Sequence, residues 1–180
     1  EMALVKSQLD PHFLFNTINN IDILISKDAD EASRYLNQLS DIMRFMLYET
    51  KAEEIPLAKE LEYIEKYIQL QKIRTSNGNY VNYEVSGQTT EQKVAPMVFI
   101  PFIENAFKHS GNKKTANAVD IGIKIEADAI TFSCENKFEP KRKEPNGANG
   151  LGNELIKRRL KLLYPDRHDL AVDHKNGWYS

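Results

Sequence analysis

Hydrophobic residues recur with a helical period over the first 75 residues of the chain and with a strand period in several later segments. The first helical face comprises Leu14, Ile18, Ile21 and Ile25. A polar connector at 26–33 separates it from a second face, made of Tyr35, Leu36, Leu39, Ile42, Met43 and Met46. Two helices joined by a short polar turn predict an antiparallel hairpin.

Apolar residues cover so much of this hairpin that it cannot be stable alone. We expect it to pair with a second copy in a dimeric four-helix bundle. The alternative is that the hairpin packs on the rest of its own chain.

The pattern changes after Pro56, which is well placed in the first turn of a third helix. The apolar positions of that helix are Leu57, Leu61, Ile64, Ile68 and Ile73. Alternating strands are predicted at 80–85, 119–126 and 129–136, helices at 95–110 and 152–164, and a closing hairpin with its turn at Asn176-Gly177.

This order of elements predicts an α+β protein with two domains. Residues 1–53 form the helical hairpin and residues 54–180 form the mixed unit, whose last strand is expected to be truncated. Both ends of the chain look cut, so we expect it to be part of a longer protein.

Composition excludes several classes of function. The formal net charge is −2, which gives no basic field for direct nucleic-acid binding. Cys134 is the one cysteine, so there is no internal disulfide and no cysteine-based zinc site, as in a reducing compartment. The sequence contains no signal peptide and no apolar run long enough to span a bilayer.

The stretch DPHFLFN places a proline and a histidine inside a helical pattern. Pro11 disfavours helical geometry at Asp10, so a bend or loosened turn is expected just before His12. Asn16 lies one turn after His12 on the same face and could orient its imidazole, and Asp10 is the alternative. Three apolar residues are expected to anchor the bundle: Phe13, Leu14 and Phe15. Taken alone, His12 fits an ordinary surface histidine better than a reactive one. His168 and His174 have no further context and are interpreted as surface residues near the last hairpin.

Four polar residues share adjacent faces of the predicted helix PFIENAFKHS. Glu104 and Lys108 are four residues apart, as are Asn105 and His109. The pattern fits a solvated face with a surface ion pair. It also fits a site for a magnesium triphosphate, because hard oxygens suit magnesium and cations neutralise phosphate.

A glycine cluster, NGANGLGNE at 146–154, precedes the predicted helix at 152–164. Gly150 and Gly152 would let the backbone approach a phosphate at the helix start, although an ordinary flexible loop has the same composition. The P-loop and Rossmann patterns are both absent.

These segments, in this order, resemble the sensor histidine kinases of the LytS type. QLDPHFLFNTINNI (8–21) resembles their phosphoacceptor segment, and PFIENAFKHS resembles the asparagine box of their ATP-binding domain. NGLGNELIKRRLKLLYP (149–165) resembles the late glycine box, and NGWYS resembles the start of the last strand. The resemblance covers nearly the whole chain.

The resemblance implies a dimerisation and phosphotransfer hairpin followed by an α/β sandwich of the histidine kinase/Hsp90 type. His12 would receive the γ-phosphoryl group of ATP and pass it to an aspartate of a response regulator, often one with a LytTR-type DNA-binding domain. The chain would be the cytoplasmic portion of a bacterial membrane protein, anchored by an upstream segment.

The resemblance also assigns roles to single residues. Asn105 matches the ligand of Mg²⁺, and Glu104 matches the acidic neighbour that positions or activates groups in the phosphoryl step. The other nucleotide-binding positions are Lys108 and His109 on the phosphate side, Gly150 and Gly152 in the ATP lid, and Asn136 at the adenine.

Three departures from the family pattern stand out. Asn136 replaces the usual aspartate and the glycines that should follow it are missing, so weaker nucleotide binding is expected. Asn153 and Leu155 exchange the usual residue types, and the segment 137–149 is short for a lid. A degenerate kinase that acts as a dimeric, regulator-binding scaffold is therefore the alternative. A gyrase-like ATPase would leave DPHFLFN unexplained.

Overall fold

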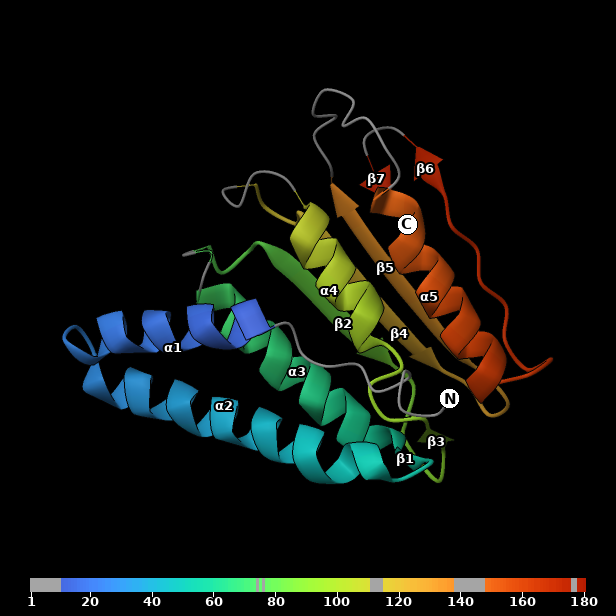
Figure 1. Cartoon of the computed structure of the whole chain (residues 1–180), viewed down its shortest axis with the longest axis horizontal. Coiled ribbons are helices and arrows are strands. Elements are labelled where there is room, and N and C mark those ends of the chain that lie inside the picture. The colour runs from blue at the N-terminus through green and yellow to red at the C-terminus, as the bar shows by residue number, and fades with distance from the viewer. Residues whose placement is uncertain (1–10, 74, 76, 111–114, 138–147, 176–177) are drawn as a thin grey trace.

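The computed structural model describes residues 11–73, 75, 77–110, 115–137, 148–175 and 178–180, with only the backbone described at 148–153 and 174–175. The helices are α1 (Pro11–Ile25), α2 (Ala29–Tyr48), α3 (Leu57–Ile73), α4 (Ile100–His109) and α5 (Ala148–Leu163), with a short 3₁₀ turn at Glu49–Lys51. The strands are β1 (Ile55–Pro56), β2 (Val81–Ser86), β3 (Lys93–Val94), β4 (Val119–Ile125), β5 (Ile130–Lys137), β6 (His174–Lys175) and β7 (Trp178–Tyr179). The predicted α+β class is confirmed (Figure 1).

The main sheet is mixed and has the strand order β2-β4-β5-β7-β6. Strands β2 and β4 run parallel, with Val81 opposite Val119, and the remaining pairs are antiparallel. A separate two-stranded sheet pairs β1 with β3. The sequence did not reveal β1 and β3, because strands of two residues are too short to show alternation.

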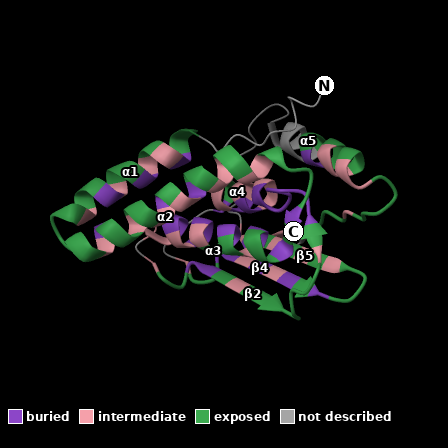
Figure 2. Ribbon diagram, turned by 90° about the horizontal axis from the view of Figure 1, so that it is seen from below, coloured by how far each residue is buried: buried purple, intermediate pink, exposed green. Residues whose placement is uncertain are grey.

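Helices cover one face of the main sheet, and the other face is uncovered (Figures 1 and 2). On β5, Phe132 stacks on Phe99 at 4.8 Å between ring centroids, while its neighbours Thr131 and Ser133 are exposed. Because only one face of the strand is buried, apolar and polar residues alternate along it, and this alternation predicted the strand from the sequence.

The connector between α1 and α2 is shorter than predicted, because α2 begins at Ala29 rather than after residue 33. Asp28 caps the helix, since its side chain accepts a hydrogen bond from the backbone N–H of Glu31 at 2.9 Å. Glu31 in turn places a carboxylate in the first turn. An aspartate followed three residues later by a glutamate is a helix-start signal that marks this boundary.

The buried face of α1 differs from the predicted one. Phe13, Thr17 and Ile21 are buried, whereas Ile18 and Ile25 are exposed. Thr17 fits this face because its hydroxyl donates to the carbonyl of Phe13 at 2.8 Å, which leaves no unsatisfied donor. The second apolar row of α1 therefore faces solvent in the single chain.

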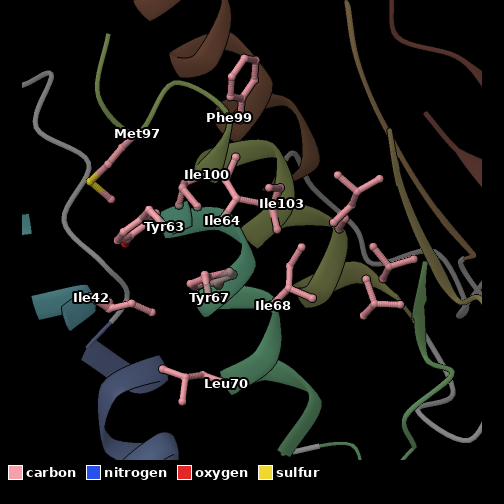
Figure 3. Packing of buried hydrophobic residues seen from close by; sticks show 14 of the residues in the cluster. Ile42, Tyr63, Ile64, Tyr67, Ile68, Leu70, Met97, Phe99, Ile100 and Ile103 are labelled. Carbon is pink, nitrogen blue, oxygen red and sulfur yellow. The ribbon is translucent and has the colours of Figure 1, made fainter. Parts of the chain in front are cut away.

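The hairpin packs on α3, and the buried residues of the two regions form one continuous cluster (Figure 3). Phe13 stacks on Tyr67 with ring centroids 4.8 Å apart, and Phe45 packs on Tyr63 at 4.3 Å. The hairpin thus contacts the rest of its own chain, as in the alternative considered above. The domain division at residues 53/54 stays a prediction.

Two helix starts differ from the predicted ones. Helix α4 begins at Ile100 instead of residue 95, because the preceding turn contains Pro96 and a left-handed residue, Met97 with φ 58°. Helix α5 begins at Ala148, so Gly150 and Gly152 lie inside its first turns rather than before it. The predicted Asn176-Gly177 turn lies outside the described residues, although β6 and β7 pair around it.

Candidate functional site

His12 is an exposed residue in the first turn of the described helix α1. The side-chain amide nitrogen of Asn16 lies 2.9 Å from Nδ1 of His12 and 3.4 Å from its Nε2. The predicted pairing of these side chains across one helical turn is therefore present. Asp10, the alternative partner, lies outside the described residues, as does the bend expected before His12.

The apolar residues after His12 divide between two sides of α1. Phe13 is buried against Tyr67, and Leu14 is half-buried. Phe15 is 67% exposed in the single chain, so the expectation that it anchors the bundle stays a prediction that depends on the proposed dimer. Successive helical residues point about 100° apart, so three in a row cannot share one contact surface.

Helix α4 carries the four predicted polar residues on its second half. Glu104 and Asn105 are half-buried, and Lys108 and His109 are exposed near the last turn. Partial burial, and then the neighbouring Lys108 ammonium, lower the pKa of His109. The helix ends at Ser110, whose hydroxyl forms a hydrogen bond with that of Tyr80. This end of α4 combines a carboxamide, a carboxylate and a cation.

Asn136 is the polar residue at the end of the buried face of β5. It is 1% exposed, and its Nδ2 has no hydrogen-bond partner among the described residues. The predicted alternation of Phe132, Cys134 and Asn136 along one face is present. Helix α4 runs along β5 in the same direction as the strand. Phe99, just before the helix, stacks on Phe132, and the Phe102 carbonyl accepts a hydrogen bond from Cys134 Sγ at 3.8 Å. Asn136 and the second half of α4 are therefore at the same end of this layer.

The third predicted part of the site is only partly described. Gly150 and Gly152 have helical backbone at the start of α5, and the segment 138–147 between β5 and α5 lies outside the described residues. Further along α5, Ile156 is buried, and Leu160 and Tyr164 pack against the core. The helix that follows the glycine cluster is thus fixed on the same layer as α4.

The sequence analysis missed the residues that hold the turn before α4. Glu60 of α3 is fully buried and accepts a hydrogen bond from the Met97 backbone N–H at 2.9 Å. Arg159 donates to the Pro96 carbonyl at 3.0 Å, and Tyr164 accepts from the Ala95 N–H at 2.7 Å. Glu60 was detectable, because it falls three residues after Leu57 and four before Ile64 on the apolar side of the helix.

The described residues contain no group of three or more His, Cys, Asp or Glu side chains able to hold a metal ion by themselves. A divalent cation at Asn105 would therefore need ligands from a phosphate and from water, which is the usual way in which Mg²⁺ binds. Within the described part of the chain, no helix has the length and apolar character needed to cross a membrane.

Comparison with known proteins finds similarity to histidine kinases. The histidine kinase family model matches residues 1–79. The sensor histidine kinase BtsS of Escherichia coli is 30% identical over 176 residues, which is 96% of this chain and 30% of that protein. The chain is related to the LytS-type sensor histidine kinases.

Sensor proteins named LytS are also similar to this chain. The LytS protein of Staphylococcus epidermidis is 31% identical over 76% of this chain and 23% of its own length. That of Enterococcus faecalis is 34% identical over 70% of this chain and 22% of its own length. The chain therefore spans less than a third of these sensor kinases. Residues 1–79 of the kinase match include α1, α2 and α3, together with His12.

Proposed function

We propose that this chain is the kinase core of a two-component sensor, which transfers the γ-phosphoryl group of ATP to His12 and then to an aspartate of a response regulator. The observation that carries the proposal is the pairing of an exposed His12 with Asn16 at 2.9 Å, above a buried Phe13. The imidazole is exposed to solvent, and Asn16 is one of the groups that orient it.

The chemistry requires an unprotonated ring nitrogen on His12. Neutral imidazole provides one near pH 7 and is a good nucleophile there. When the Asn16 amide is turned so that its oxygen accepts from Nδ1–H, the lone pair resides on Nε2, the outer nitrogen. That nitrogen forms a bond to the γ-phosphorus while the bond to the bridging oxygen breaks, and ADP leaves.

Helix α4 and β5 supply the nucleotide side of the proposal. Asn105 offers a hard amide oxygen to Mg²⁺, which would neutralise charge on the phosphates, and Glu104 is next to it. Lys108 and His109 would meet phosphate oxygens. The unpaired Nδ2 of buried Asn136 fits a ligand that supplies an acceptor, and adenine N1 is such an acceptor. Gly150 and Gly152 would close over the phosphates from α5.

Partners follow from the same proposal. The exposed apolar row of the hairpin supports a homodimer, and its members include Phe15, Ile18, Leu36, Met43 and Leu47. The phosphorylated His12 would be read by a response regulator, with a LytTR-type DNA-binding domain as the expected output unit. The sensing and membrane-anchoring functions would reside outside this chain.

Labelling with γ-³²P-ATP and Mg²⁺ tests the proposal. Wild-type protein should acquire acid-labile, base-stable label, and His12→Ala should acquire none. His168→Ala is the matched control, because its exposed histidine has no proposed role, and it should label like wild type. Equal labelling of wild type and His12→Ala would contradict the proposal.

Nucleotide affinity separates the proposal from the scaffold alternative. Asn136 in place of a carboxylate motivates that alternative, because a neutral amide interacts more weakly than a charged acceptor with the adenine amino group. Calorimetry with a non-hydrolysable ATP analogue and Mg²⁺ decides. Absence of binding at millimolar analogue would favour a dimeric scaffold, whereas binding that is lost in Asn105→Ala supports the kinase.

A further inference from the structure

The turn at 95–99 leads into α4, and its conformation requires stabilising contacts from other parts of the chain. Met97 is buried and has φ 58°, a left-handed conformation that costs about 1 kcal/mol or more for a residue other than glycine. The N-cap residue of α4, Phe99, makes no side-chain hydrogen bond to the helix. Within α4, the N–H groups of Phe102 and Ile103 donate to the Phe99 carbonyl. The N–H groups of the turn itself, up to the N-cap residue, therefore depend on partners from elsewhere in the fold.

Side chains from two other helices provide these partners. Glu60 of α3 accepts from the Met97 N–H at 2.9 Å, and the N–H groups of Val98 and Phe99 also point towards its carboxylate. From α5, Arg159 and Tyr164 bind the carbonyl of Pro96 and the N–H of Ala95. Figure 3 shows Met97, Phe99 and Ile100 above Tyr63 and Ile64, one turn after Glu60 along α3.

A carboxylate in this position acts as a helix cap supplied by tertiary structure. Negative charge near the amino end of a helix interacts favourably with the helix dipole and with the free N–H groups. The interaction is strongest when Glu60 is ionised, because N–H bonds to a charged acceptor are about twice as strong as neutral ones.

The cap lies one turn away from the proposed nucleotide ligands. Glu104 and Asn105 follow Ile100, the first residue of α4, by four and five positions on a rigid ten-residue helix. A shift of the first turn therefore moves both side chains. Displacements of about 1 Å in a positioned group can cost about a hundredfold in rate.

We propose that Glu60 is a positioning residue of the ATP site, whose carboxylate caps α4 and so sets the place of Glu104 and Asn105. The proposal rests on the proposed kinase function. Arg159 and Tyr164 complete the clamp and connect it to α5, the helix that follows the proposed lid.

The ionisation of Glu60 gives the proposal a distinctive signature. Burial raises the pKa of Glu60 to about 7, against the opposing effects of the Met97, Phe99 and Val98 N–H groups and the Arg159 charge. The other titratable groups that face it are Tyr63 on α3, Tyr83 on β2 and Tyr164 on α5, and burial raises the pKa of all three. These tyrosines stay neutral near pH 7, so Glu60 is the group that changes charge there.

The test compares the initial rate of His12 labelling in wild type and Glu60→Gln from about pH 6 to about pH 8.5. Glutamine resembles the protonated acid, and the ratio of the two rates cancels every pH dependence that the two proteins share. The ratio should rise from near one at the acid end to about tenfold at the alkaline end. Glu65→Gln, the same change at an exposed site on α3, is the matched control and should give a ratio near one throughout.

A rate ratio that is flat with pH, or equal to that of Glu65→Gln, overturns the proposal, including the case of a uniformly slower Glu60→Gln. Should Glu60→Gln fail to fold, Glu60→Asp keeps the charge but shortens the reach to Met97. A wild-type rate in Glu60→Asp at the alkaline end would then overturn the proposal. Wild-type protein that neither binds nucleotide nor labels contradicts the proposed kinase function itself, which is a distinguishable failure.

Discussion

The α1–α2 hairpin and the sheet with its covering helices bury their apolar residues in different ways. Central strand β4 buries Val119, Ile121 and Ile123 almost completely within one chain. The hairpin leaves a row of large apolar side chains in solvent, among them Phe15, Ile18 and Leu47. The sheet buries its apolar face within the chain, although Leu155 and Leu162 on α5 are exposed. The hairpin buries only the side that rests on α3. The same contrast separates the proposed phosphoacceptor from the proposed nucleotide site.

The largest expected effects come from exchanging one residue in each region. His12→Ala should abolish labelling from ATP, because it removes the proposed phosphoryl acceptor. Asn105→Ala should reduce labelling by about a hundredfold or more, because it removes the proposed ligand of Mg²⁺. Only Asn105→Ala should also lose affinity for a magnesium–ATP analogue in calorimetry. Loss of nucleotide binding in His12→Ala would break the assignment of separate roles to the two regions.

Core truncation should distinguish the regions by stability. Ile121→Ala creates a cavity beneath α4 and should lower the free energy of unfolding by about 3 kcal/mol. Ile18→Ala, at a 50% exposed site, should cost less than about 1 kcal/mol in the monomer. Urea titration followed by circular dichroism measures both values.

Measuring the oligomeric state of Ile18→Ala and Ile121→Ala gives a second test of the difference between the hairpin and the sheet unit. Ile18→Ala should weaken the proposed dimer in analytical ultracentrifugation, and Ile121→Ala should leave association of the folded protein unchanged. Wild-type protein that remains monomeric at high concentration would remove the explanation for the exposed row of the hairpin.

Buried Glu60 should make stability depend on pH in an unusual direction. Its pKa is raised from 4.5 to about 7, so the folded state holds the proton more tightly than the unfolded state. Its contribution is therefore complete below about pH 4.5 and is lost as pH rises to about 7, a change of about 3 kcal/mol. Denaturant titrations at several pH values should show that Glu60→Gln lacks this loss relative to wild type. If the free energy of unfolding changed with pH in the same way in wild type and Glu60→Gln, this prediction would be contradicted.

The smallest effect is expected at the surface link between α2 and α3. Lys66 Nζ lies 2.8 Å from Asp41, and its hydrogen bond, more than its charge, lowers the pKa of that carboxyl. Because the folded-state pKa is depressed, the stabilisation is present above the unfolded value and lost as pH falls through the folded one. Asp41→Asn should cost less than about 1 kcal/mol at neutral pH, because the pair is solvent-exposed. Thermal melts at low and high salt measure it.

Much of the fold was predictable because burial is one-sided. The alternation of β5 placed Phe132, Cys134 and Asn136 on one face, and the structure has them there. The helices of the sheet unit were found for the same reason, apart from their starts. Helix α4 begins late because the left-handed Met97 leaves no trace in a hydrophobic pattern.

The hairpin was harder to predict because apolar residues occupy more than one of its faces. Periodicity chose Ile18 and Ile25, while the structure buries Phe13 and Thr17. The number of apolar residues on a helix face does not tell whether that face packs on α3 or binds another molecule. Within the site, the Asn16–His12 pair followed from spacing alone, but the clamp of Glu60 and Arg159 joins residues 99 positions apart, and local sequence does not encode such contacts.

Phe13 stacks on Tyr67, and Tyr67 contacts Phe107 edge to face with ring centroids 6.2 Å apart, so aromatic rings link α1 through α3 to α4. A rotation of α1 would be opposed first by its contact with the Tyr67 ring of α3 and then by the contact of Tyr67 with the Phe107 ring of α4. Rotation of α1 by a single residue step, about 100°, would pull Phe13 out of this stack while it swings His12 around the helix axis. A movement of α1 that displaces the proposed acceptor, His12, would therefore also disturb the aromatic contacts that reach the helix carrying Asn105.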